Sequence, residues 1–154
     1  MLWGSEKARV DDKHRLCFPT KIRKRLQETY HSNDVFITSL DGKEVKVFPR
    51  QEWSQMLDRL NVRSTDGSAQ DGRLKNSVLM LANRYGAEGS LDNQGRVLIP
   101  GALREAPGIE GDVWVVWQST HLLVMSEEGF QQKTTEAEAQ LSGEGLAYAE
   151  NLGL

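Results

Sequence analysis

One stretch of the 154-residue chain occurs twice, and this repeat constrains the fold more than any other feature. Residues 10–23, VDDKHRLCFPTKIR, return without a gap as residues 91–104, LDNQGRVLIPGALR. A fixed-period repeat indicates copies of one supersecondary unit that bury their apolar faces against each other. Charged, proline and apolar positions keep their character in the pairs Asp11/Asp92, Arg15/Arg96, Pro19/Pro100, Arg23/Arg104, Val10/Leu91, Leu16/Val97, Phe18/Ile99 and Ile22/Leu103.

Turn formers and alternating apolar residues predict the same order of elements in each copy. Residues 11–14 and 92–95 are the turns of two hairpins, because Asp, Asn and Gly favour turns, and Gly95 suits a positive φ. A proline opens a short helix after each hairpin. A second hairpin and a second helix follow, so the order is β-β-α-β-β-α, twice. Helices are expected over residues 20–29, 50–60, 101–106 and 127–141.

The repeat also divides the chain. Residues 1–62 form the first half and residues 86–142 the second. Residues 63–85 are a linker, with a loop at 63–72 and a connector helix after it, and residues 143–154 are a loosely ordered acidic tail. Neither half has enough strands to bury both sheet faces alone. We therefore expect a mainly β fold in which two internal repeats complete one sheet with pseudo-two-fold symmetry.

Charge is distributed unevenly along the chain. The net charge is −3, but residues 1–30 carry eight basic and four acidic groups, whereas residues 105–154 carry nine acidic groups and one lysine. The first segment is therefore +4 and the last −8, so a local basic surface for nucleic acid is compatible with the overall charge. No apolar run suggests a membrane span. The single cysteine, Cys17, favours a reducing cytoplasm.

The Asp-x-x-x-Arg spacing, Asp11/Arg15 and Asp92/Arg96, allows two interpretations. A turn aspartate can accept backbone N–H groups and orient a guanidinium on the returning strand. An oriented guanidinium binds phosphate oxygens or the O6/N7 edge of guanine. Alternatively, the pair only staples its hairpin. The surrounding basic residues favour DNA binding for the first copy, and the second copy is more structural.

Catalysis and metal binding are not expected. Asp11, His14 and Cys17 lie close in sequence, but Cys17 aligns with Leu98, which is interpreted as a core position, and residues three apart on a strand point to opposite faces. The three histidines show no ligand spacing. No catalytic residue, metal, cofactor or small-molecule substrate is therefore predicted.

The tryptophans are interpreted mainly as core residues. Trp53 and Phe130 occupy equivalent helix positions in the repeat, and Trp114 matches Phe36. The repeat leaves Trp3 and Trp117 as candidates for a subunit contact.

The pattern resembles the MraZ family of bacterial transcriptional regulators, in the AbrB/MazE/SpoVT-like swapped-hairpin superfamily. The resemblance covers residues 1–142: the start MLWGS, both Asp-x-x-x-Arg hairpins, FPRQEW at 48–53 and, most specifically, YGAEGSLDNQGRVLIPGALRE at 85–105. His14 replaces the glycine expected in the first turn, Asp12 adds a carboxylate there, and residues 121–125 lack the expected acidic-apolar-Trp ending.

This resemblance implies a double-split β-barrel that assembles into a ring of eight or more subunits. Such a ring binds direct repeats of double-stranded DNA upstream of its own operon, the division and cell-wall gene cluster, and represses it at the nucleoid. The residues expected to bind DNA are Lys13, His14, Arg15, Lys21, Arg23, Lys24, Arg25 and Arg96. Those expected to shape the motif are Asp11, Asp92, Pro19, Pro100 and Gly95.

Two alternatives stay open. One is an antitoxin-like member of the superfamily whose C-terminal segment wraps a toxin. The other is a ring scaffold that has lost DNA binding, to which His14 and Asp12 point.

Overall fold

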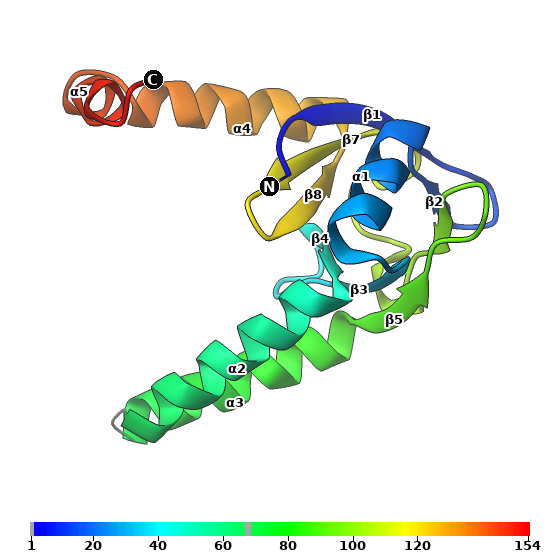
Figure 1. Ribbon diagram of the computed structural model, residues 1–154, viewed down its shortest axis with the longest axis horizontal. Coiled ribbons are helices and arrows are strands. Elements are labelled where there is room, and N and C mark those ends of the chain that lie inside the picture. The colour runs from blue at the N-terminus through cyan, green and yellow to red at the C-terminus, as the bar shows by residue number, and fades with distance from the viewer. Residues whose placement is uncertain (1, 67–68) are drawn as a thin grey trace.

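The computed structural model describes residues 2–66 and 69–154, and the predicted order of strands and helices is confirmed within them (Figure 1). The connector helix lies between the two copies, and one further helix follows the second. The elements are β1 (Ser5–Val10), β2 (Arg15–Cys17), α1 (Thr20–Tyr30), β3 (Asp34–Thr38), β4 (Val45–Pro49), α2 (Arg50–Asp66), α3 (Ala69–Tyr85), β5 (Ala87–Ser90), β6 (Arg96–Leu98), the 3₁₀ helix η1 (Gly101–Leu103), β7 (Gly111–Gln118), β8 (His121–Met125), α4 (Glu127–Gln140) and α5 (Glu144–Asn151).

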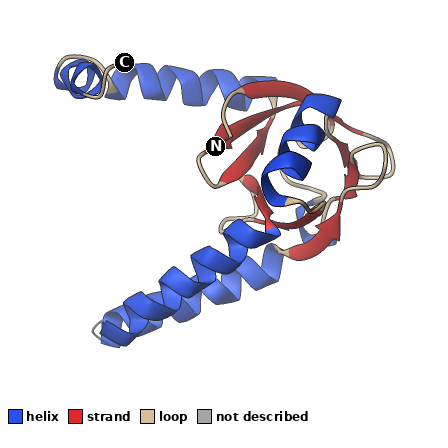
Figure 2. Cartoon of the chain, in the orientation of Figure 1, coloured by secondary structure: helices blue, strands red, loops and turns tan. Residues whose placement is uncertain are grey.

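The strands form one antiparallel sheet in the order β5-β3-β4-β8-β7-β1-β2-β6, which curls into a nearly closed barrel (Figure 2). Four of its pairings, β1–β7, β2–β6, β3–β5 and β4–β8, join a strand of one copy to a strand of the other. The predicted mainly β fold, built from two interleaved repeats, is confirmed.

The pseudo-two-fold relation is clearest where β2 meets β6. Leu16 pairs with Val97, its own counterpart in the repeat. Beyond the strands, the Phe18 N–H donates to the Gly95 carbonyl at 2.9 Å, and the Ile99 N–H donates to the His14 carbonyl at 2.9 Å. Each turn is therefore held by the strand end of the other copy.

Strand alternation decides which side chains of this pair reach the core. Leu16, Phe18, Val97 and Ile99 are buried. Leu98, however, is 55% exposed and Cys17 is only half-buried, so the interpretation of their shared position as a core position was wrong. The reason is the two-residue period of a strand, which turns this position outward when its neighbours point inward.

An aromatic pair joins a helix to the sheet in each copy. Phe36 stacks on Trp53 with ring centroids 4.3 Å apart, and Trp114 stacks on Phe130 at 4.5 Å. The predicted packing role of these residues is confirmed. Trp117 is buried, with 7% of its surface exposed, so its assignment to a subunit contact was wrong.

Two helical arms leave the barrel on one side, α2–α3 and α4–α5 (Figure 1). The loop expected over residues 63–72 was largely wrong, because α2 continues to Asp66 and α3 begins at Ala69, while residues 67–68 lie outside the described ranges. The loosely ordered tail was also wrong, since α5 occupies it. The helix expected over 101–106 shortens to η1. None of the described helices is long and apolar enough to cross a membrane.

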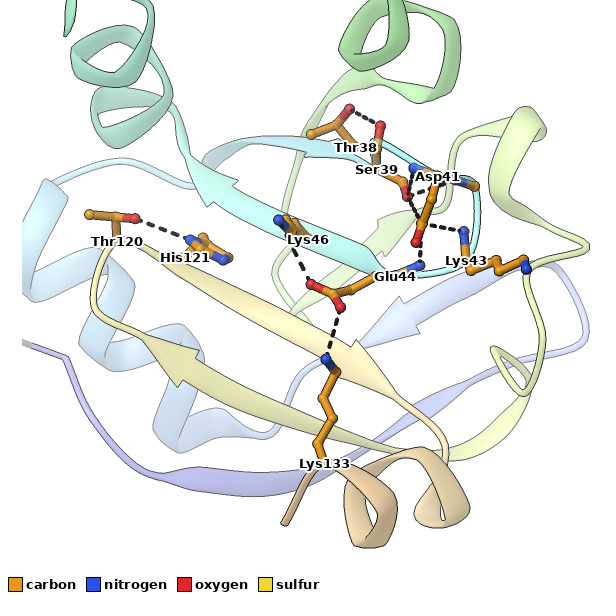
Figure 3. A network of polar contacts seen from close by, with 10 residues as sticks. Thr38, Ser39, Asp41, Lys43, Glu44, Lys46, Thr120, His121 and Lys133 are labelled. Atoms are coloured by element: carbon orange, nitrogen blue, oxygen red, sulfur yellow. Dashed lines mark hydrogen bonds and ion pairs between the residues drawn. The ribbon is translucent and has the colours of Figure 1, made fainter. Parts of the chain in front are cut away.

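The α4–α5 arm is joined to the barrel by polar contacts at its base. The Ser126 hydroxyl caps α4 by accepting the Gly129 N–H at 3.0 Å. Glu44, in the hairpin between β3 and β4, lies 2.9 Å from Lys133 of α4 and 3.7 Å from Lys46 (Figure 3). Beyond this base, α4 buries no residue, so it projects as an exposed rod.

Candidate nucleic-acid interface

The first turn is organised by Asp11. Its Oδ1 accepts the backbone N–H groups of Lys13 at 3.0 Å and Arg15 at 2.9 Å, and its Oδ2 accepts Nε–H of Arg15 at 2.7 Å. The Arg15 backbone N–H, followed by its guanidinium, lowers the pKa of Asp11 below its ordinary value, and the same carboxylate raises the pKa of Arg15. The carboxylate therefore shapes the loop and orients the guanidinium together.

The second turn repeats this geometry. Asp92 Oδ1 accepts the N–H groups of Gln94 and Arg96, both at 2.9 Å, and Oδ2 accepts Nε–H of Arg96 at 2.8 Å. The backbone N–H of Arg96 is the main cause that lowers the pKa of Asp92. In both copies the side-chain bond uses Nε, so the Nη hydrogens are left to bind an acceptor outside the hairpin.

His14 and Gly95 take the same backbone conformation at the ends of these turns. Their φ angles are 61° and 77°. His14 therefore adopts the positive φ of the glycine that it replaces, although only glycine adopts it without steric cost. The hydrogen bond that the His14 carbonyl accepts from Ile99 stabilises this conformation, so the histidine preserves the turn.

The structure brings the two arginines to one surface. On the paired strands β2 and β6, Arg15 lies opposite Leu98 and Cys17 opposite Arg96. These four positions alternate with the buried Leu16 and Val97, so they share the outer face of the barrel wall. We call them the β2–β6 face. It lies beside both turns, on the side of the barrel away from the helical arms (Figure 1).

The remaining basic candidates fall into two groups. Lys13, His14 and Lys24 are exposed. By contrast, three side chains of α1 contact the chain itself. Lys21 lies 2.9 Å from Glu6, Arg23 donates to the Asn93 carbonyl, and Arg25 donates to the Trp3 carbonyl at 2.8 Å with its guanidinium over the Trp3 ring.

Beyond the turns, the two copies share their prolines but differ at Arg23 and Arg104. Pro19 and Pro100 precede α1 and η1, as expected. Arg23 crosses to the turn of the second copy, whereas its counterpart Arg104 donates Nε–H to the Ile99 carbonyl of its own copy at 3.3 Å. The first helix therefore supports the second turn, and η1 makes no equivalent contact among the described residues.

The Cys17 thiol is not arranged as a nucleophile. Burial, followed by the charge of Asp11, raises the pKa of Cys17, which disfavours the reactive thiolate. Its Sγ–H points to the Arg15 carbonyl at 3.6 Å. No group of three or more possible metal ligands occurs among the residues that the structure describes.

Arg9 is a basic residue that the sequence analysis did not single out. It lies on β1 opposite Cys17, which places it next to the β2–β6 face. Its side chain is largely exposed and lies 3.8 Å from an equally exposed Asp112. Its place between the apolar Ala8 and Val10 was the available signal, because successive side chains of a strand point to opposite faces.

These features define a class of protein: a double-split β-barrel with paired Asp-x-x-x-Arg turns on one side. The family model of the MraZ protein, described as antitoxin-like, matches residues 84–145. A transcriptional regulator MraZ from Acidobacterium capsulatum is 37% identical over 95% of this chain and its own full length. Proteins of the same name from Koribacter versatilis and Caldicellulosiruptor saccharolyticus are 31% and 30% identical, over 95% and 100% of this chain and the full length of each. The chain belongs to the MraZ family.

Proposed function

We propose that this protein is a transcriptional regulator that binds double-stranded DNA through the β2–β6 face and the two turns beside it. The observation that carries the proposal is that Arg15 and Arg96 share this face, each held by the aspartate of its own turn. A guanidinium held in this way is ready to bind phosphate or a guanine edge without further ordering. The relatives named transcriptional regulators support the same function.

The distribution of charge supports the orientation on DNA. The exposed Lys13 and Lys24 and the exposed Arg9 add positive charge to the first copy. The −8 segment from residue 105 onward includes the α4–α5 arm, which leaves the other side of the barrel (Figure 1). Phosphates are attracted to the first surface and repelled by the second, so the turns face the duplex.

The proposed assembly is a homo-oligomeric ring of eight or more subunits. In such a ring each subunit makes a weak contact, and several subunits bind direct repeats spaced along one face of the duplex. The affinity of the assembly then exceeds that of one subunit, provided that the repeat spacing matches the subunit spacing. The proposed target is the DNA upstream of the protein's own operon, the division and cell-wall gene cluster, which the ring represses at the nucleoid in the cytoplasm.

The test is binding of Arg15→Ala and Arg96→Ala to this upstream DNA, in a mobility-shift assay at two salt concentrations. Each loss of an arginine contact is expected to cost about 1–3 kcal/mol per subunit, or roughly 5- to 150-fold in affinity. Arg59→Ala, on the exposed surface of the α2–α3 arm, is the matched control and should bind like the wild type. Unchanged binding by both turn variants overturns the proposal and leaves the scaffold without DNA binding as the better hypothesis.

A further inference from the structure

The C-terminal segment, residues 141–154, is rich in exposed apolar side chains. Tyr148 is 66% exposed and Leu154 is 89% exposed, and the segment also exposes Leu141, Leu146 and Leu152. Exposed apolar residues scattered singly are ordinary, but five within 14 positions are a concentration that points to a partner. The segment buries no residue in its own chain.

Helix α4 holds this segment away from the barrel. Its 14 residues correspond to a length of about 21 Å at 1.5 Å per residue. The α4–α5 arm and the α2–α3 arm leave the barrel on separate courses (Figure 1), so α5 does not meet α3 of the same copy. A partner of the segment must therefore come from outside this chain.

Helix α3 presents an apolar surface of its own. Leu74, Val78 and Leu81 follow the i, i+4, i+7 spacing of one helix face. Leu74 and Leu81 of this face remain exposed although α2 packs beside α3. This surface on the α2–α3 arm is called the α3 face.

The two surfaces have opposite charge. Residues 134–154 contain four glutamates and no basic residue, a charge of −4. Helix α3 contains Arg73, Lys75 and Arg84 against Asp71, a charge of +2. Glu144 and Glu150 flank the apolar residues of α5, and Arg73 and Lys75 flank Leu74. Complementary potentials of this kind steer partners together and fix their register.

We propose that residues 141–154 of one copy dock on the α3 face of a second copy. The apolar side chains of α5 pack on Leu74 and Leu81, and Glu144 and Glu150 lie against Arg73 and Lys75. The contact is heterologous, because two different surfaces meet, and every copy carries one of each. Contacts of this type build a ring when the rotation between copies closes. The inference rests on the multivalent assembly of the proposed function and names its contact.

This contact also leaves the DNA-binding surface free. Both arms lie on the side of the barrel away from the turns (Figure 1). Because every copy makes the same contact through its arms, each β2–β6 face is left uncovered and takes the same position relative to its neighbours.

The experiment exchanges charge between the two surfaces in the full-length protein. The first variant is Glu144→Lys with Glu150→Lys, and the second is Arg73→Glu with Lys75→Glu. All four side chains are exposed or half-buried, so each variant is expected to fold, which circular dichroism checks. Native mass is measured without DNA for the wild type, for each variant alone and for a mixture of the two variants.

Each variant alone should fall to small species, because its two surfaces then carry the same sign. In the mixture, the basic α5 of the first variant meets the acidic α3 of the second, and the acidic α5 of the second meets the basic α3 of the first. The mixture should therefore regain a large assembly with alternating subunits. The control Glu28→Lys with Glu110→Lys has the same change in charge as the first variant, on exposed residues outside both arms, and should keep the wild-type mass.

Three results overturn the docking. They are a wild type that is monomeric, variants that keep the wild-type mass, and a mixture that regains nothing. A small second polypeptide bound to α5 in place of another copy overturns it as well and favours the antitoxin-like alternative. Arg15→Ala separates this inference from the proposed function, since it should lose DNA but keep the wild-type mass. If it instead keeps DNA while the charge variants dissociate, DNA binding through the β2–β6 face fails and the docking stands.

Discussion

The carbonyl oxygen of His14 accepts the backbone N–H of Ile99 at 2.9 Å, so a residue of the first turn is fixed by the second copy. The reciprocal bond joins Gly95 and Phe18 at the same distance. These two bonds position both Asp-x-x-x-Arg turns relative to one another. They also explain how a histidine remains in a conformation that favours glycine, because leaving it would break a hydrogen bond between the copies.

His14→Gly should stabilise the protein. The left-handed conformation costs a non-glycine residue roughly 1–2 kcal/mol, and glycine loses somewhat more entropy on folding, so the net gain is expected to be about 0.5–1 kcal/mol. Urea unfolding followed by tryptophan fluorescence measures it. Asp12→Gly, in the same turn but without a positive φ, should be destabilising. A His14→Gly protein less stable than the wild type would show that the imidazole makes a contact that outweighs the strain.

Gly95→Ala should destabilise the protein. Gly95 has a φ of 77°, and a Cβ at this position would lie 3.0 Å from the Phe18 carbonyl, the oxygen of the residue that bonds back to this turn. Steric strain and weakening of the hydrogen bond between the Phe18 N–H and the Gly95 carbonyl together are expected to cost about 1–3 kcal/mol. The midpoint of urea unfolding measures this loss. Gly101→Ala has open space for its Cβ and no positive φ, so it is the control that should stay near the wild type.

The repeat allowed much of the fold to be predicted, because apolar residues at matched positions identify the strands of both copies. It could not predict which way Cys17 and Leu98 point. Aligning the two copies shows which residues are equivalent, but not which of them face the core and which face outward. Both helices of the α2–α3 arm were expected, but their full length was not, because RSTDGSAQDG has the composition of a loop whereas α2 continues to Asp66 and α3 begins at Ala69. The contacts of Arg23 and Arg25 join elements distant in sequence, and no local pattern encodes them.

Acid should weaken the two turns. Backbone and guanidinium hydrogen bonds lower the pKa values of Asp11 and Asp92 in the folded state, so folding favours the ionised carboxylates. This stability is present above the unfolded pKa of about 3.9 and is lost as pH falls through the lower folded values. Urea unfolding between pH 6 and pH 2.5 measures it. Asp11→Asn with Asp92→Asn should be less stable than the wild type near neutral pH and should show a shallower decline below about pH 4. Parallel curves throughout would mean that these carboxylates contribute no pH-dependent stability.

Lys24 and Lys21 should affect DNA binding differently although both are basic residues of α1. Lys24 is exposed, whereas Lys21 lies 2.9 Å from Glu6, which already offsets its charge. Each phosphate that a lysine neutralises adds about 0.9 to the slope of log affinity against log salt. Lys24→Gln should therefore reduce this slope by about 0.9 for each subunit on the duplex, and Lys21→Gln should reduce it less. Affinities for the upstream DNA, titrated at four salt concentrations, give the slopes. Equal slopes for the two variants would show that the ion pair with Glu6 opens on DNA, because Lys21 would then bind phosphate as freely as Lys24.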